Sequence, residues 1–313
     1  MAASVLSAPH FHDEQAAFDY VEAKLWPNGP TCPHCGNADA KRIRKMQGKT
    51  TRVGLRKCNE CRKPFTVRMG TIFESSHLPL NLWLQIIHLM CASKKGISTR
   101  QIQRMLICSM KTAWFLTHRI RESMRSGDLF PMGGSGQTVE IDETYIGRKV
   151  GEPVRGGGHH KNAVLTLVER GGAARSFHIE KATVANIAPI VRDNIARESR
   201  IMTDEARFYP GVGREFAAHE TVDHSRNEYG YTDRVTGFVS HTNTVEGFYS
   251  VFKRGMIGVY QHCGEQHLHR YLAEFDFRYS NRVKLGVDDM ERADRALAGV
   301  KGKRLTYETT AGR

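Results

Sequence analysis

The sequence predicts a multidomain α/β protein, and three observations carry that prediction. Residues 1–127 hold 20 Lys and Arg against 8 Asp and Glu, a net +12 of the total formal charge of +13, so residues 128–313 are almost neutral. Four of the seven cysteines form two Cys-x-x-Cys pairs in the basic part. From residue 138 onward, strand-like and helix-like patterns alternate. We expect a basic front end followed by an α/β domain with its own core.

The excess of positive charge makes a polyanion the expected partner, and its position indicates a nucleic-acid-binding front end. The most apolar run, residues 78–90, is interrupted by Asn81, Gln85 and His88 and is too short to span a bilayer. Residues 1–9 lack the basic segment of a signal peptide. We therefore expect a cytoplasmic protein with no membrane partner.

The first motif is the pair Cys32 and Cys35 with Cys58 and Cys61, two knuckles separated by 22 residues. Two thiolates on a tight turn share one Zn²⁺, and a second pair completes a closed tetrahedral site, so we expect one structural zinc. Two disulfides are the alternative, which the missing secretion signal disfavours. His34 is expected to be a bystander. The cations between the knuckles suit phosphate contact, with a solvated hairpin as the alternative; they are Lys41, Arg42, Arg44, Lys45, Lys49, Arg52, Arg56 and Lys57.

Residues 96–124 predict two helices with a short break. Ser98 is placed to cap the first helix and Ser109 to cap the second. The pattern resembles a helix-turn-helix, although pure packing units share it. The residues expected on or near the recognition helix, facing a DNA groove, are Lys111, Thr112, Thr117, His118 and Arg119.

The back end opens with a predicted strand at 138–147, in which Asp142 lies on the face opposite Ile141. A predicted hairpin follows at 162–170 and 174–180, joined by a glycine turn. Residues 183–196 predict a helix interrupted or kinked near Pro189, and residues 199–206 predict a short buried strand with Asp204 at its exit.

Residues 241–255 predict a helix with two different faces. Val245, Phe248 and Phe252, with Tyr249 at the margin, form an apolar face. The opposite face carries Asn243, Glu246, Ser250 and Lys253. A carboxylate and a lysine two turns apart suit an enzyme that holds a metal at one turn and a nucleic-acid phosphate at the other. An amphipathic surface helix is the alternative.

The order of these elements resembles the ribonuclease H-like fold. Together with the knuckles and the helix-turn-helix, the chain resembles a DDE transposase of a bacterial insertion sequence, in the zinc-ribbon branch with an ISXO-type transposase domain. Four blocks in order carry the resemblance: CPHCG with CNECRKPFTV, EIDETYIGRK, MTDEARFY, and HTNTVEGFYSVFKRG followed by HLHRYLAEFDFRYSNR. It implies a zinc ribbon at 15–72, a helix-turn-helix region at 78–127, a ribonuclease H-like catalytic domain at 136–285 and a C-terminal tail at 286–313.

The resemblance also implies roles. Asp142, Asp204 and Glu246 would hold two Mg²⁺ or Mn²⁺ ions, with Lys253 as the basic residue and Arg254 beside it on the DNA. Asn243 is the alternative third ligand; Glu246 is favoured because a carboxylate brings negative charge to a hard cation. The remaining acids nearby, expected to be solvated or structural, are Glu140, Glu143 and Glu205.

The implied activity is binding of transposon-end DNA, phosphodiester cleavage and transfer of 3′-hydroxyl ends to target DNA, with double-stranded DNA as partner and a homo-oligomer in the synaptic complex. Asp223-His224 stands where the family usually has Asn-His, and His159 and His160 are expected in a surface loop. Two alternatives stay open: a domesticated DNA-binding regulator that keeps the fold, and a metal-dependent nuclease without strand transfer.

Overall fold

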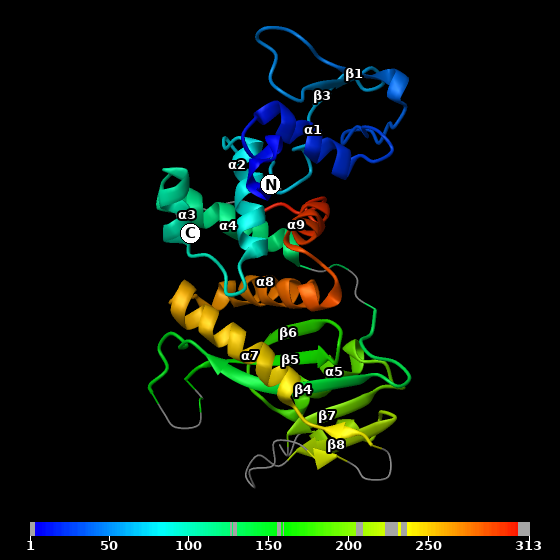
Figure 1. The fold of residues 1–313 in the computed structure, drawn as a ribbon, viewed down its shortest axis with the longest axis vertical. Helices are drawn as coiled ribbons and strands as arrows, with labels where there is room; N and C mark the ends of the chain where they lie inside the picture. The colour runs from blue at the N-terminus through cyan, green and yellow to red at the C-terminus, as the bar shows by residue number, and fades with distance from the viewer. Residues whose placement is uncertain are drawn as a thin grey trace. The chain divides into compact units, whose positions relative to one another are not determined.

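The computed structural model describes residues 4–125, 127, 130–154, 158, 160–204, 209–222, 231–232 and 237–305. They belong to two compact units, which we describe separately (Figure 1). Unit 1 comprises Met1–Arg125 with Val287–Arg313, and unit 2 comprises Ser126–Gly286. Among the described residues, no helix is both long and apolar enough to cross a membrane.

Unit 1 begins with α1 (Glu14–Leu25), which starts where the Asp13 carboxylate accepts a hydrogen bond from the Ala16 amide. A small antiparallel sheet follows, made of β1 (Ile43–Lys45), β2 (Arg56–Cys58) and β3 (Pro64–Phe65). Its core is a cluster of Cys32, Ile43, Cys58 and Phe65. So few apolar residues supply little burial energy, and the sheet needs another source of stability.

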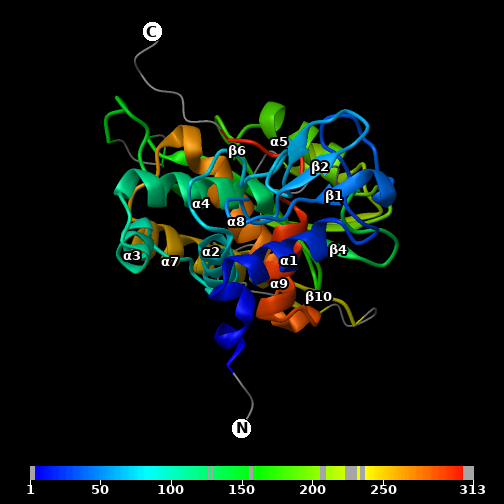
Figure 2. The same cartoon turned by 90° about the horizontal axis from the view of Figure 1, so that it is seen from above.

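The rest of unit 1 is helical: α2 (Leu80–Ala92), α3 (Thr99–Leu106), α4 (Met110–Met124) and α9 (Asp289–Ala298). Both predicted caps are confirmed, since Ser98 accepts from the Gln101 amide at 3.2 Å and Ser109 from the Thr112 amide at 3.0 Å. In this unit α1, α2 and α9 pack together (Figure 2).

The stretch expected to be a C-terminal tail contains α9 and joins unit 1. The buried guanidinium of Arg292 donates to the carbonyl oxygens of Cys91 at 2.9 Å and Val287 at 3.2 Å. It therefore satisfies a carbonyl at the last turn of α2 and fixes the start of α9. Cys91 lies some two hundred residues before Arg292 in the chain, so no local pattern indicates this contact.

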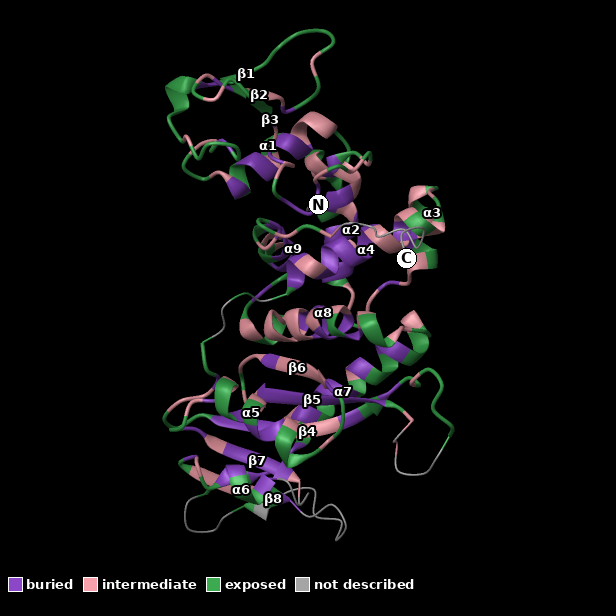
Figure 3. Cartoon of the chain, turned by 180° about the vertical axis from the view of Figure 1, so that it is seen from behind, coloured by how far each residue is buried: buried purple, intermediate pink, exposed green. Residues whose placement is uncertain are grey.

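Unit 2 is built on a five-stranded sheet in the order β6-β5-β4-β7-β8. β4 pairs antiparallel with β5 and parallel with β7, β5 pairs antiparallel with β6, and β7 pairs parallel with β8. Figure 3 shows β5 buried along almost its whole length. The strands span Thr138–Ile146 (β4), Asn162–Glu169 (β5), Ala174–Ile179 (β6), Arg200–Asp204 (β7) and Ala218–Val222 (β8).

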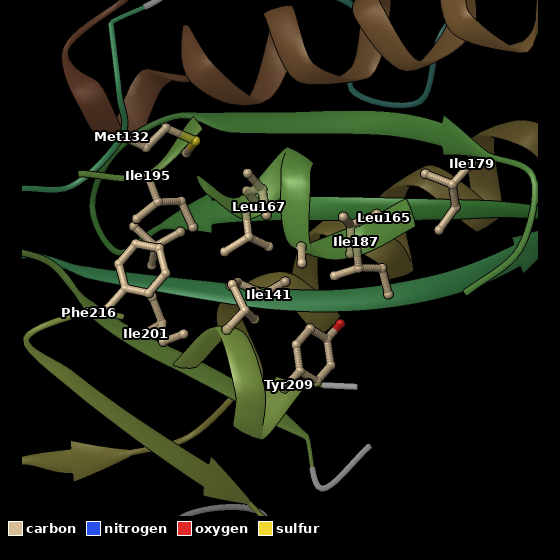
Figure 4. Packing of buried hydrophobic residues seen from close by; sticks show 14 of the residues in the cluster. Met132, Ile141, Leu165, Leu167, Ile179, Ile187, Ile195, Ile201, Tyr209 and Phe216 are labelled. Carbon is tan, nitrogen blue, oxygen red and sulfur yellow. The ribbon is translucent and has the colours of Figure 1, made fainter. Parts of the chain in front are cut away.

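Helices cover both faces of this sheet. On one face, α5 (Val184–Asn194) and α6 (Tyr209–Gly213) pack on a cluster that includes Val139 and Ile141 (Figure 4). On the other face lie α7 (Asn243–Gly255), its π-helical extension Met256–Tyr260, and α8 (Leu268–Ser280). A second small pair, β9 (Tyr231–Thr232) with β10 (Val239–Ser240), precedes α7. The expected fold class, a multidomain α/β chain with a ribonuclease H-like domain, is confirmed.

The predicted hairpin and the predicted helices of unit 2 are present at nearly the expected bounds. α5 runs on through Pro189 as one helix, so the expected interruption there is wrong. The strand expected at 199–206 is β7, which ends at Asp204.

Ile107 is strained, because it adopts a left-handed backbone conformation, φ 49° and ψ 47°, where α3 ends. A β-branched residue is poorly suited to that conformation, and the side chain is 93% exposed, so packing offers no compensation. We expect Ile107→Asn to stabilise unit 1 by about 1 kcal/mol. Denaturation of the full chain followed by tryptophan fluorescence measures this, since Trp26, Trp83 and Trp114 all lie in unit 1. Ile107→Val keeps the strain and serves as the control; an equal midpoint for both variants would contradict the assignment.

Candidate functional site

The four knuckle cysteines meet in space. Their sulfur atoms all lie within 4.8 Å of one another, with 3.7 Å between Cys32 and Cys61 and 3.7 Å between Cys35 and Cys58. Tetrahedral zinc–thiolate bonds require sulfur–sulfur distances of about 3.8 Å. The backbone N–H of Cys61 lowers the pKa of the Cys58 thiol, while burial and the neighbouring thiols raise the pKa of Cys35. These residues fit a closed structural zinc site. His34 points elsewhere, with Nε2 3.3 Å from the Pro64 oxygen.

One cross-strand pair of cations in the ribbon is neutralised. Lys45 lies opposite Arg56 in the β1–β2 register. The Arg56 guanidinium donates to both Glu22 oxygens, at 3.2 and 2.5 Å, and Lys45 lies 3.4 Å from Asp19. Both acids come from α1, so this face of the ribbon is attached to the helix and its charges are balanced.

The neighbouring pair is different. Arg44 lies directly opposite Lys57, so two like charges share the other face of the strand pair. Both residues are exposed, and neither has an acidic partner among the residues that the structure describes. The nearby Arg42 pairs with Glu60 at 2.9 Å. The ribbon therefore keeps an uncompensated positive face.

The burial of the predicted recognition helix α4 changes along its length. Lys111 and Thr112 lie in its first turn, where Lys111 is exposed and Thr112 half-buried. Thr117 and His118 are fully buried and Arg119 is 4% exposed. The expectation that these three face a DNA groove is wrong, because the second half of α4 is a core helix.

Arg119 illustrates the reason. Its guanidinium donates to the backbone carbonyl oxygen of Glu74 at 2.6 Å and lies 5.5 Å from the ring centroid of Trp83 and 5.4 Å from that of Phe115. It links the segment before α2 to α4. An arginine on a predicted helix reads as a surface cation until its tertiary partners are known.

The acids of unit 2 lie just beyond the point where the parallel pairing of β4 with β7 ends. β4 and β7 pair up to Glu140 opposite Met202, and Asp142 and Asp204 each lie two residues further along. They share the sheet face opposite the cluster containing Ile141, as expected. Burial, together with the charges of Glu143, Asp204 and Glu246, raises the pKa of Asp142 to about 7. Four acidic side chains thus influence one another at this edge of the sheet.

The helix α7 crosses this edge. The Tyr249 hydroxyl is buried and donates to the Asp142 carbonyl oxygen at 2.6 Å, which attaches the middle of α7 to the strand that carries Asp142. Asn243 and Glu246 are both exposed in the first turns, where Glu246 accepts a 3.3 Å hydrogen bond from Thr242. Lys253, which was predicted on the same polar face of α7, is also exposed.

Arg254 follows Lys253 in the last turn. It is exposed, and its guanidinium donates to the Ser250 carbonyl oxygen at 2.9 Å and also to the Ser250 hydroxyl. The Lys253 ammonium lies 5.8 Å from the Tyr249 ring centroid. Both cations therefore stay on the polar side of α7.

Within the described ranges, the four cysteines are the only group of three or more His, Cys, Asp or Glu residues whose possible metal-ligand atoms all lie within 4.8 Å of one another. The three acids Asp142, Asp204 and Glu246 are neighbours without converging on a single point. An all-carboxylate set with two ions about 4 Å apart does not require that convergence. The donor set is hard oxygen and strongly anionic, and it fits Mg²⁺ or Mn²⁺.

Glu140 and Glu143, which were expected to be solvated or structural and not metal ligands, make different contacts. Glu140 is fully buried and bonded to the start of α7, a structural role. Glu143 is half-buried and accepts a 2.7 Å hydrogen bond from the buried Tyr209 hydroxyl. Burial, together with the charge of Asp204, raises the pKa of Glu143 to about 7. Glu143 was expected to be solvated or structural; its position directly after Asp142 is the only sequence feature that links it to the acidic group. Glu205, His159 and Asp223-His224 lie outside the described residues.

Comparisons with known proteins agree with this geometry. A family model described as the ISXO2-like transposase domain matches residues 133–280, and one described as the transposase zinc-ribbon domain matches residues 12–64. A curated relative, an uncharacterized protein in the transposable element ISH50 of Halobacterium salinarum, is 27% identical over 86% of this chain and 91% of its own length.

Among solved structures, a simian T-cell lymphotropic virus intasome in complex with PP2A regulatory subunit B56 gamma matches 56% of this chain and 67% of its own, with 13% identity. Its TM-score of 0.28 is too low to support an argument.

The fold, the thiolate cluster and the family matches together define a DDE transposase with a zinc ribbon. The chain belongs to the insertion-sequence transposases in which that ribbon precedes an ISXO2-like transposase domain.

Proposed function

We propose that this transposase binds transposon-end DNA, cleaves phosphodiester bonds at the ends and transfers the freed 3′-hydroxyl groups to target DNA. The observation that carries the proposal is the group of Asp142, Asp204 and Glu246, which come from β4, β7 and the first turns of α7 and are near enough for the charges of Asp204 and Glu246 to raise the pKa of Asp142. Partly buried acids repel one another, and a divalent cation is the partner that relieves this. Two transposon ends joined in one complex imply more than one copy of the chain.

Asp142, Asp204 and Glu246, or Asn243 in place of Glu246, would hold the two Mg²⁺ or Mn²⁺ ions. The bound ions would supply an activated water and stabilise the leaving oxygen. Lys253 and Arg254, on the same helix, are placed to contact DNA phosphates beside the reacting bond. Lys111 and Thr112 at the start of α4 are placed to contact the end DNA.

The proposed chemistry is tested by Asp142→Asn and Asp204→Asn. Each substitution keeps the side-chain shape and removes a negative ligand, so Mg²⁺-dependent cleavage should fall at least a hundredfold while end-DNA binding stays near wild type. A gel-shift assay beside a cleavage assay measures both. Asp193→Asn, at an exposed site on α5, is the control. Parallel loss of binding and cleavage would mean that the two acids are structural, and cleavage without strand transfer would favour the nuclease.

The third ligand is tested on α7. If Glu246 is the ligand, Glu246→Gln should remove cleavage in both Mg²⁺ and Mn²⁺, and Asn243→Ala should leave measurable turnover. Both residues are exposed, so neither change should alter the thermal stability of the chain. The reverse pattern, with Asn243→Ala inactive and Glu246→Gln active, would assign the role to Asn243.

The uncompensated ribbon face is the second proposed DNA contact. Arg44→Gln combined with Lys57→Gln should weaken end-DNA binding and reduce the slope of log K against log salt by about 1.8, the value for two phosphate contacts. Lys45→Gln is the matched control, because Lys45 already pairs with Asp19. Zinc content checks that the ribbon stays folded. Equal salt slopes for the double variant and the control would exclude this face as a contact.

A further inference from the structure

The fully buried carboxylate of Glu140 caps the start of α7. One of its oxygens accepts hydrogen bonds from the backbone amides of Thr244 at 2.8 Å and Val245 at 3.0 Å. The other accepts from the Thr244 hydroxyl at 2.7 Å. The residue in the usual capping position, Thr242, makes no side-chain capping bond. A carboxylate from the central strand of the sheet therefore satisfies amides that a local side chain normally satisfies.

Arg170 completes the arrangement at the end of β5. Its Nε donates to Glu140 at 2.7 Å, and its two terminal nitrogens donate to the carbonyl oxygens of Val239 and His241, each at 2.7 Å. His241 also places Nδ1 3.1 Å from the Glu140 carboxylate. One planar fork thus binds both the capping carboxylate and the chain that leads into α7, which a lysine cannot reproduce.

The contacts of Glu140 and Arg170 lie next to the acids of the proposed metal site. The Glu140 carboxylate accepts hydrogen bonds from the amides of Thr244 and Val245. These two residues lie between Asn243 and Glu246 on the first turn of α7. Glu140 lies two residues before Asp142 on the same face of β4, so one strand carries both the anchor and the first acid. A shift of α7 along its axis would move Asn243 and Glu246 relative to Asp142.

We propose that Glu140 and Arg170 form a positioning pair that fixes the first turn of α7, and with it the third metal ligand, relative to Asp142. The inference rests on the proposed function of that acidic group. Neither residue touches the reacting atoms in this scheme; both act through the placement of α7.

The experiment uses the full chain with Arg170→Lys and Glu140→Gln, and three measurements. Arg170→Lys keeps the charge and loses the fork. Hydrogen exchange should speed up at the amides of residues 243–249 and stay unchanged in β4 and β5. Calorimetric titration with Mn²⁺ alone should show affinity at least tenfold weaker. Binding of end DNA should stay within twofold of wild type.

Two further variants separate positioning from a general loss of stability. Glu22→Gln breaks the ribbon's part-buried pair with Arg56, at side-chain exposures of 10% and 16%, and should lower stability without changing Mn²⁺ affinity or exchange in α7. Glu140→Gln combined with Arg170→Gln leaves no unpaired buried charge, so it should recover folding if either single variant fails to fold. That double variant should still bind Mn²⁺ weakly.

The outcomes distinguish this inference from the function beneath it. Asp142→Asn should abolish Mn²⁺ binding; if it binds Mn²⁺ like wild type, the proposed metal site itself is wrong. If Asp142→Asn loses Mn²⁺ while Arg170→Lys and the double variant retain wild-type affinity and exchange, the metal site stands and the positioning pair is wrong.

Discussion

The constraint that organises unit 2 is the need to hold like charges close together. Asp142, Asp204, Glu143 and Glu246 come from β4, β7 and α7, and burial together with mutual repulsion raises the pKa of Asp142 to about 7. Two of the contacts that hold β4 and α7 together are made to backbone atoms and not to the carboxylates of Asp142 and Glu246. The Tyr249 hydroxyl donates to the Asp142 carbonyl oxygen, and the Glu140 carboxylate accepts from backbone amides of α7. The elements that carry the two acids are thus fixed by groups other than the acids themselves.

Unit 1 meets a different constraint, because its ribbon buries too little apolar surface to fold on that basis alone. The thiolates of Cys32, Cys35, Cys58 and Cys61 replace a core, and the energy of zinc binding becomes energy of folding. The ribbon is then attached to α1 by the part-buried Arg56–Glu22 pair. Breaking that pair leaves a charge with little water to solvate it, so the pair specifies which face of the ribbon meets α1. The opposite face keeps Arg44 and Lys57 uncompensated.

The sequence predicted what local chemistry determines. Ser98 and Ser109 cap helices because their neighbours repeat at helical spacing, and Asp142 alternates with Ile141 because strands have a period of two. It failed where a partner lies far away in the chain. Arg119 was expected to face DNA, but it donates to the backbone carbonyl oxygen of Glu74, and Arg292 likewise donates to that of Cys91. Glu140 was expected to be solvated or structural, and the structural role is the one observed; its particular partner could not be predicted, because nothing near Glu140 in the chain shows that residues about a hundred positions later need a cap. The roles of Asp142, Asp204, Asn243 and Glu246 remain a prediction.

The capping of α7 by Glu140 also bears on where substrate charge is met. The N-terminus of a helix normally attracts phosphate through its free amides and its dipole. Here the amides of Thr244 and Val245 are already bonded to an anion, so the first turn of α7 has little left to offer a phosphate. Positive charge stands at the other end instead, where Lys253 and Arg254 complement the negative end of the dipole. Under the proposed function, α7 would hold a metal ligand in its first turns and contact phosphate two turns later, at the end that carries Lys253 and Arg254.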